Sequence, residues 1–483
     1  MAPHDDEMNR RRQRREEMRR KQEEEQKRLK TGLIIATILL VVCAISLLAI
    51  VRDTGVDLTP ETKVTTPKAT KPPETQAPQS WAEQNATTTI HLRAAGDLNI
   101  TDKVVASGLS VTSGYEFTRA FIDVAPLMSE AELTVLNLEG NIVGEPYGTA
   151  RTSAPNQLLE ALRSAGVDLI QMANSASINN GLIGLNSTLQ AIHNAGMEPI
   201  GAYASQEDFE RAKGYTICEA QGIKIAFVAF TKGMNGMGLP AGSEDCVNLL
   251  YTDYDSEYKK TDTEGITKIL KNVAAEKPDI TIALLHWGSE GTDSHSDTQE
   301  RIVNLMKKQG VDVIIGSHPH RLHKIDFDKA AGTLIAYSVG DFYGDATAGG
   351  SNYSIILDIE ITKDNHAGVT RVTGFDYIPI YTLKESDCAD GDRRVVRIHE
   401  AMLAYEGNFV DSITTACYED MKYSLGRITE RIEGNYTGVK TESTDAAETT
   451  AAAETTAETT IAAETSAAAQ TTAAPQNTET TGS

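Results

Sequence analysis

Residues 311–322 read VDVIIGSHPHRL, an apolar run that gives way abruptly to glycine, serine and histidine. The run Val311 to Ile315 predicts a buried strand, because β-branched residues suit a sheet. The residues after it predict a loop at the carboxyl end of that strand. Two histidines separated by one proline, His318 and His320, stand in this loop. Histidine is a common metal ligand, so this strand end is a candidate site.

The same alternation of short apolar runs and helical periodicity extends over residues 89–385. Strands are predicted at Thr89–Ala94, Leu133–Leu136, Asp168–Met172, Ile223–Phe230, Ile280–Leu285, Val311–Ile315, Thr333–Tyr337 and Ser354–Ile361. Helices are predicted at Tyr115–Met128, Asn156–Ala165, Ile183–Ala195, Thr263–Ala275 and Asp297–Gln309. The last helix begins at a capping box of Ser296 and Gln299 and is closed by Gly310. This alternation predicts an α/β or mixed sheet with helices on its faces.

Side chains that can ligate metals follow five of the predicted strands. In chain order they are Asp97, Glu139, Asn174, His286, and the pair His318 and His320. Each of them alone is as well explained by a turn or a core position. Together they favour one site, because the carboxyl ends of strands in an open α/β sheet converge on one crevice. Oxygen and imidazole ligands suit Mn, Zn or Fe better than Ca.

Five segments resemble the CapA family, the poly-γ-glutamate capsule synthesis domain of the calcineurin-like metallophosphoesterase fold. They are AAGDLNI (94–100), NLEG (137–140), LLHWGSEG (284–291), IIGSHPHRL (314–322) and YSVGDF (337–342). The resemblance runs from about Ile90 to Asp345. It implies a fold of the α/β class, a four-layer α/β/β/α sandwich, with a metal site on loops at the strand ends.

The resemblance also implies roles for single residues. The metal ligands would be Asp97, Glu139, His286, His318 and His320, and His286 with Glu290 would be catalytic. Asn137, Trp287 and Arg321 would contact the substrate. The cofactor would be a divalent metal, Mn, Zn or Fe.

One segment departs from the family pattern. Members of the family read A-N-N-H-x-x-D-x-G, whereas residues 173–181 read ANSASINNG, so that Ser175, Ala176 and Asn179 replace Asn, His and Asp. The change removes one metal ligand and one proton donor, and positioned acid–base groups contribute about 10²- to 10⁴-fold to a rate. Asn174 is the residue expected to serve as a ligand instead. Asp341 stands where Asn is usual, a milder change.

Two functions therefore stay open. The first is a metal-dependent hydrolase or transferase of a phosphoester, amide or extracellular polymer, with a metal-bound hydroxide as nucleophile. The second is a non-catalytic scaffold that binds or anchors an anionic cell-surface polymer during its export. A metal-free serine or cysteine hydrolase is not supported, because no G-x-S-x-G elbow and no Cys and His motif is present.

Charge argues against nucleic acid as a partner. The 483 residues carry a net charge of −23, and residues 31–439 alone carry −20. A body this acidic repels phosphate backbones. The expected partners are instead the membrane, an anionic cell-surface polymer, and the machinery that makes or exports that polymer.

Residues 31–51, TGLIIATILLVVCAISLLAIV, contain no charge and predict one transmembrane helix. A cleaved signal peptide fits less well, since its apolar region would span about 7 to 15 residues. Eleven Lys and Arg precede the span and four lie in the 20 residues after it, which predicts a cytoplasmic N-terminus and an extracellular domain.

The expected organisation has six parts. They are a charged cytoplasmic segment (1–30), the transmembrane helix (31–51), a Thr/Pro/Lys-rich linker (52–88), the CapA-like domain (89–385), a helical C-terminal extension packed on it (386–439) and a disordered Thr/Ala/Glu-rich tail (440–483). Cys218, Cys246, Cys388 and Cys417 follow the span without CxxC spacing. Two disulfides are possible there, with three connectivities.

Overall fold

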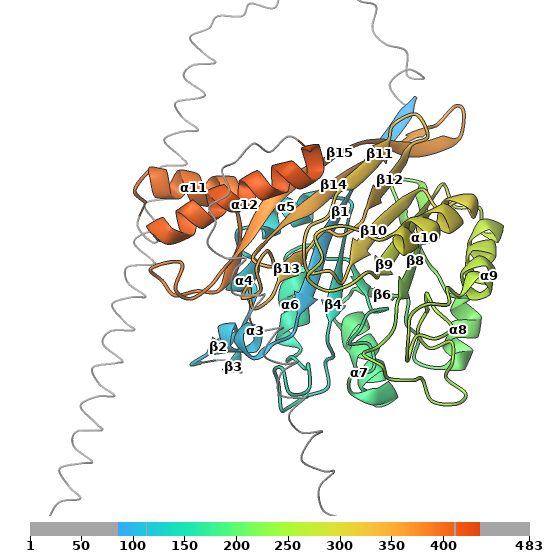
Figure 1. Ribbon diagram of the computed structural model, residues 1–483, viewed down its shortest axis with the longest axis horizontal. Coiled ribbons are helices and arrows are strands. Elements are labelled where there is room, and N and C mark those ends of the chain that lie inside the picture. The colour runs from blue at the N-terminus through green and yellow to red at the C-terminus, as the bar shows by residue number, and fades with distance from the viewer. Residues whose placement is uncertain (1–85, 113, 410–411, 435–483) are drawn as a thin grey trace, which may run out of the picture. The chain divides into compact units, whose positions relative to one another are not determined.

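A computed structural model describes residues 86–112, 114–409 and 412–434 (Figure 1). The predicted cytoplasmic segment, the transmembrane helix at 31–51, nearly all of the linker and the C-terminal tail lie outside the described residues. Within the described ranges, no helix is both long enough and apolar enough to cross a membrane.

The described chain alternates strands and helices as expected. The strands are β1 (Thr87–Asn99), β2 (Leu109–Ser110), β3 (Gly114–Tyr115), β4 (Leu133–Glu139), β5 (Leu169–Gln171), β6 (Glu198–Ile200), β7 (Thr216–Ala220), β8 (Ile223–Thr231), β9 (Ile280–His286), β10 (Val313–Ser317), β11 (Ile325–Asp328), β12 (Thr333–Ala336), β13 (Asp341–Tyr343), β14 (Tyr353–Asp364), β15 (Val369–Leu383) and β16 (Arg394–Arg397). The helices are α3 (Asp102–Ser107), α4 (Thr118–Phe121), α5 (Ala125–Glu130), α6 (Gln157–Ser164), α7 (Gly181–Asn194), α8 (Gln206–Ala212), α9 (Thr263–Ala275), α10 (Asp297–Lys308), α11 (Ile398–Glu406) and α12 (Thr415–Glu433). All eight predicted strands are present, with ends shifted by one to several residues.

Two large mixed sheets form the domain, and β2 and β3 pair as a small separate sheet. The first has the order β16-β15-β14-β1-β4-β5-β6, with β13 also paired to β1, and the second has the order β11-β12-β10-β9-β8-β7. Strands β1, β4, β5 and β6 are parallel neighbours, and so are β8, β9, β10 and β12. The mixed α/β class predicted from the sequence is therefore confirmed.

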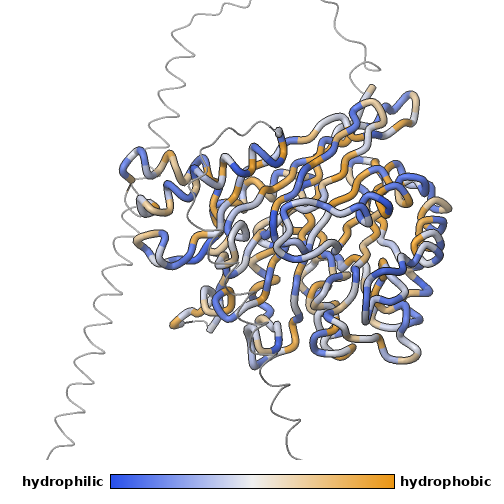
Figure 2. Tube along the Cα trace, in the orientation of Figure 1, coloured by the Kyte–Doolittle hydropathy of each residue, from blue (hydrophilic) through white to orange (hydrophobic). Residues whose placement is uncertain are grey.

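The apolar core lies between the two sheets and on the far side of the second sheet. In β8, Ile225 and Phe227 belong to the core shared with the first sheet, whereas Val228 and Phe230 belong to a second core. Helices α9 and α10 supply apolar residues to this second core. Figure 2 shows the same pattern, with hydrophobic segments along the central strands. Because strand side chains alternate between faces, neighbouring residues of one strand serve different cores.

One predicted helix is wrong as a single element. The segment Tyr115–Met128 contains the end of β3 and then two short helices, α4 and α5, that meet near Val124. Pro126 lies in the first turn of α5. A proline suits a helix start but lacks the N–H that a helix interior needs, so a new helix begins there.

Two other local predictions fare better. The capping box of Ser296 and Gln299 is present at the start of α10. The helix ends at Lys308 with Gln309 as its C-cap residue, and Gly310 follows at a φ of 89°. The C-terminal extension contains β16 and the helices α11 and α12. Helix α12 packs against β14 and β15 and buries Met421 and Ile428 in the core.

Candidate metal centre

The predicted ligands come from parallel strands of both sheets. Asp97 lies in β1, Glu139 ends β4, and His286 ends β9. His318 and His320 lie in the loop that follows β10. Because β1 neighbours β4 and β9 neighbours β10, the two facing sheets bring these five side chains to one place.

Close backbone approach at Gly96 places Asp97. The Asp97 N–H donates to the carbonyl of Gly340 at 3.0 Å. A Cβ atom on Gly96 would lie 1.7 Å from that same carbonyl oxygen, so only glycine fits. The approach also pairs β1 with β13, where Asp97 stands opposite Asp341. Asp341 thereby joins the centre.

We call Asp97, His320 and Asp341 the Asp341 side of the centre. His320 Nδ1 lies 2.8 Å from Asp341 Oδ1 and 3.5 Å from Asp97 Oδ2. One ligand atom from each of the three residues falls within 4.8 Å of the others. The imidazole is therefore held between two carboxylates, in an arrangement that could also enclose a metal ion.

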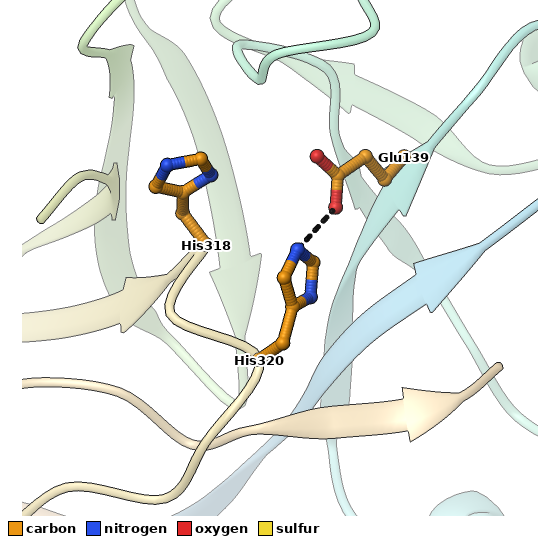
Figure 3. Close-up of side chains that lie close together, drawn as sticks. All are labelled: Glu139, His318 and His320. Atoms are coloured by element: carbon orange, nitrogen blue, oxygen red, sulfur yellow. Dashed lines mark ion pairs between the residues drawn. The ribbon is translucent and has the colours of Figure 1, made fainter. Parts of the chain in front are cut away.

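We call Glu139, His286 and His318 the Glu139 side. His286 Nε2 lies 3.4 Å from Glu139 Oε1, and His320 Nε2 from the Asp341 side lies 3.7 Å from Glu139 Oε2. Figure 3 shows the rings of His318 and His320 on one side of the Glu139 carboxylate. Glu139, His318 and His320 form a second group of ligand atoms within 4.8 Å of one another.

Three atoms of the Glu139 side are buried without a hydrogen-bond partner among the described residues. They are Glu139 Oε2, His286 Nε2 and His318 Nδ1. An unsatisfied buried polar atom costs about 1–3 kcal/mol. A divalent cation would accept lone pairs from these atoms, and their oxygen and imidazole chemistry suits a transition metal. The residues present therefore fit a metal ion.

Electrostatics of the Asp341 side follow from burial and close charges. Burial lowers the pKa of His320, but Asp341, Glu139 and Asp97 outweigh it and raise that pKa to about 11. Burial, with repulsion from Asp97 and Glu139, raises the pKa of Asp341 to about 6, against the attraction of His320. Without a metal, a protonated His320 ring balances the carboxylates.

His318 behaves in the opposite way. Burial lowers the pKa of His318, nearby His286 and Lys232 add to the effect, and the value falls to about 2 although Glu139 opposes it. His318 is therefore a neutral imidazole, the form that ligates metals. The two histidines of the GSHPH loop differ in charge although one residue separates them.

Asn137 and Asn174 lie behind the ligands and hold them through hydrogen bonds. Asn137 is 2% exposed and donates to Asp97 Oδ1 at 2.7 Å. Asn174 donates to Asn137 Oδ1 at 2.9 Å, and its own amide oxygen accepts the Ala176 N–H at 3.0 Å. The substrate contact expected of Asn137 does not agree with its burial. Asn137 orients the ligand Asp97, and Asn174 in turn holds Asn137. The oxygen of Asn174 keeps a second lone pair, so the ligand role expected of it stays a prediction.

The other predicted residues are spread more widely. Trp287 is fully buried in the second core, where its indole N–H donates to the Tyr337 carbonyl at 2.9 Å, so the expected substrate contact is not possible in this structure. Arg321 pairs with Asp293 at 3.2 Å. Glu290 is exposed and lines a cavity beside His318. Alternation along β9 explains Trp287, because it faces away from His286.

The cavity has a volume of about 190 Å³. Its lining residues are Ser175, Lys232, Gly233, Asn235, Tyr258, Ser289, Glu290 and His318. Ser175, which replaces the family's Asn, donates a hydrogen bond to Glu139 Oε1. The neighbouring Ala176 is 2% exposed and brings no polar group.

Sequence reasoning missed Asp341 as part of the centre, and it missed Lys232. The YSVGDF motif contains Asp341 and was a usable signal for it. Lys232 follows β8, a predicted strand, at the same sheet edge as His286. A lysine is not a usual ligand, so the strand-end criterion passed over it.

Cys218, Cys246, Cys388 and Cys417 are all unpaired thiols in the described structure. Burial raises the pKa of the Cys388 thiol to about 11 and that of the Cys417 thiol to about 12. Thiolates are therefore not available to the centre.

Comparison with known proteins points to one family. The family described as bacterial capsule synthesis protein PGA_cap matches residues 91–346. The chain is 25% identical over 242 residues to the capsule biosynthesis protein CapA of Bacillus anthracis, covering 49% of this chain and 56% of that protein. It is 26% identical over 218 residues to the PGA biosynthesis protein CapA of Bacillus subtilis, covering 45% of this chain and 53% of that protein.

The chain thus spans about half the length of the curated relatives that it matches. Among solved structures, a calcineurin-like phosphoesterase from Bacillus subtilis aligns with 71% of this chain and 98% of its own, at a TM-score of 0.37 and 16% identity. The matched range 91–346 contains every ligand of both sides of the centre.

Proposed function

We propose that this chain, which belongs to the PGA_cap family of bacterial capsule synthesis proteins, acts in the synthesis or export of a capsule or related cell-surface polymer of the poly-γ-glutamate type. One observation carries the proposal. The range that matches the family is also the range whose strand ends build the centre, so the match covers the functional part of the domain.

The proposal includes the finer fold class, a four-layer α/β/β/α sandwich of the metallophosphoesterase type. Two facing sheets support it, together with α9 and α10 on the far side of the second sheet and α4, α7 and α12 against strands of the first. It also includes a single-pass membrane anchor at 31–51 with the domain outside the cell, supported by the uncharged apolar stretch and the excess of basic residues before it.

We further propose that the centre holds a divalent ion, Mn, Zn or Fe. The Glu139 side would bind it through its buried atoms that lack a hydrogen bond, and the Asp341 side would share it through His320. When bound, such an ion polarises a substrate oxygen or lowers the pKa of a bound water. Asn137 and Ser317 orient the ligands, since Asn137 donates to Asp97 and Ser317 Oγ lies 3.1 Å from His286 Nδ1.

Two measurements test the proposal. The full chain, purified without chelator, should contain a transition metal by elemental analysis. Deleting the gene in the organism that encodes it should reduce the amount of surface polymer, and the wild-type copy should restore it. A deletion strain with unchanged surface polymer would contradict the proposed role.

A second candidate function, a scaffold that binds the polymer without turning it over, is favoured by the segment with Ser175 and Ala176. Ala176 brings no polar group where the family pattern has a histidine, and the Ser175 hydroxyl already donates to Glu139 Oε1. A chain whose metal-free variant still restores surface polymer in the deletion strain would be a scaffold. If only metal-binding chains restore it, the first function holds.

A further inference from the structure

The cavity beside His318 contains a lysine that the proposed chemistry does not use. Lys232 is the only Lys or Arg among the described residues that line this cavity. It follows Thr231, which pairs with His286 across β8 and β9, and its N–H donates to the His286 carbonyl at 2.8 Å. The backbone at Lys232 is therefore fixed to the strand that carries a metal ligand.

The turn after Lys232 has little freedom. Thr231 Oγ1 donates to the Gly233 carbonyl at 2.9 Å. A Cβ atom on Gly233 would lie 2.2 Å from the Tyr254 carbonyl oxygen, so a larger residue would displace the turn. Pairing of β8 with β9 and the close packing of Gly233 thus fix the backbone position of Lys232.

The side chain of Lys232 is half-buried and held at its end. Nζ donates to the Gly288 carbonyl at 2.8 Å, lies 3.4 Å from His318 Nε2, and stands 4.9 Å from the centre of the Tyr258 ring. An ammonium has three N–H donors, and Gly288 accepts one of them. His318 Nε2 can accept a second only while the proton of that ring sits on Nδ1, so a metal ion bound at Nδ1 would free this donor as well. The third remains for a group in the cavity.

No carboxylate pairs with this ammonium in the described part of the chain, since no Asp or Glu there lies within 4.0 Å of Lys232 Nζ. Glu290 lines the same cavity but stands exposed at its outer part. Glu290 attracts the ammonium from a distance but does not pair with it, and partly burying a charge without a direct ion-pair partner is costly. An arrangement that keeps a lysine in this state beside a metal centre is typical of a site for an anion.

We propose that Lys232 is the anchor of an oxyanion-binding subsite next to the metal centre, which takes one phosphate or carboxylate group of the substrate. This inference rests on the proposed function and names the chemistry of its substrate. At about 190 Å³ the cavity is smaller than the roughly 300–1,000 Å³ usual for whole small-molecule ligands, so it admits one charged group and leaves the rest of the substrate outside.

Ser289 and Asn235 add polar side chains to the wall, and Glu290 adds a negative charge at the exposed edge. The lining thus holds one half-buried positive charge, Lys232, and one exposed negative charge, Glu290. A polymer of like charges would enter with one group in the cavity, while Glu290 disfavours a second anionic group at the edge.

The test is binding of two probes, inorganic phosphate and succinate, to the full chain by calorimetry with Mn²⁺ present. At least one probe should bind, and Lys232→Met should weaken it by about 10- to 100-fold, the loss expected for a hydrogen bond to a charged group. Lys232→Arg keeps the charge and should retain part of the affinity. The matched control is Lys268→Met, an exposed lysine over the ring of Phe209 and outside the cavity.

Metal content of each variant separates this inference from the proposed function. Unchanged metal in Lys232→Met together with lost anion binding supports the subsite. Unchanged anion binding in that variant overturns the subsite but leaves the metal centre standing. Wild-type protein without any metal contradicts the proposed function itself. The probe that depends on Lys232 more strongly identifies the group as phosphate or carboxylate, and failure of both probes to bind overturns the inference.

Discussion

The two sides of the centre share His320 and yet differ in how far the protein satisfies them. On the Asp341 side, the ring of His320 rests against Asp341 and Asp97, and Asn137 donates to Asp97. On the Glu139 side, three buried ligand atoms have no hydrogen-bond partner in the described chain. The first side is complete without an ion, and the second is not.

Because of this difference, we expect metal binding to be more favourable on the Glu139 side than on the Asp341 side. An ion on the Glu139 side relieves unsatisfied atoms, whereas on the Asp341 side it must compete with a protonated His320 that already neutralises the carboxylates. The Glu139 side also faces the cavity, through His318, and it includes the segment that departs from the family. We therefore expect the Glu139 side both to bind the metal ion and to carry the departure from the family pattern.

The largest effect is expected when both sides lose a histidine. His318→Ala combined with His320→Ala should abolish metal binding, because each group of ligand atoms loses a nitrogen. Elemental analysis of the purified variant measures this directly. Binding to the wild type should weaken as pH falls, because protons compete for the histidine nitrogens. Unchanged metal content in the double variant would mean that both histidines are structural.

The next effect concerns the segment that departs from the family. Ser175→Asn combined with Ala176→His should restore a ligand and a proton donor beside Glu139, and phosphoester turnover should rise by about 10²- to 10⁴-fold. Hydrolysis of a model phosphodiester, with metal content measured in parallel, checks it. Ser175→Asn alone is the control for the ligand without the proton donor.

Ala176 is buried, so a histidine there must find space. The melting temperature of the double variant shows whether it has folded. A folded, metal-loaded double variant with no turnover would favour the scaffold function. A wild type that is already active, and that the substitutions do not improve, would show that another group fills the role.

A smaller effect separates the two sides directly. Asp341→Asn removes the partner of His320 and should weaken metal binding by about 10- to 100-fold, the usual cost of losing a group that orients a ligand. Glu139→Gln removes the negative charge of a ligand whose Oε2 has no hydrogen bond, and it should weaken metal binding further. Metal titration of both variants ranks them. The reverse order would show that the ion binds mainly on the Asp341 side.

Much of the fold follows from the sequence because its strands are short, apolar and bounded by glycine. The predicted run Ile280–Leu285 agrees with β9 to within one residue. What failed was local: Pro126 divides an amphipathic pattern that reads as one helix. The long strand β15 also went unpredicted, because its polar residues lie at a partly exposed part of the sheet.

The centre divides in the same way. Ligand types at strand ends could be recognised from the sequence, because parallel strands converge there whatever lies between them. Roles that depend on side-chain direction could not. Trp287 and His286 are neighbours in sequence but face opposite sides of the sheet. The oxygen of Asn174 accepts the N–H of Ala176, two residues further along the chain.

The loop that carries both histidines is also held from outside the range matched by the family. Arg431 of α12 donates to the Leu322 carbonyl and pairs with Asp293, and Arg321 pairs with the same carboxylate. This contact fixes the loop two residues beyond His320. Because this loop supplies His318 to the Glu139 side and His320 to the Asp341 side, both sides depend on the C-terminal helix.

The smallest expected effect tests this brace by pH. Burial raises the pKa of Asp293, but Arg431 and Arg321 outweigh it and hold the pKa below its usual value. A carboxyl group with a lowered pKa in the folded state stabilises the protein above its unfolded value of about 3.9, and this contribution is lost as the pH falls through the folded pKa. Because Asp293 is half exposed, Asp293→Asn should lower the free energy of unfolding at pH 7 by less than about 1 kcal/mol. Urea unfolding of wild type and variant should show this difference at pH 7 and a difference that shrinks as the pH falls below about 3.9. A difference that stays constant down to low pH would mean that the carboxylate charge does not hold the loop.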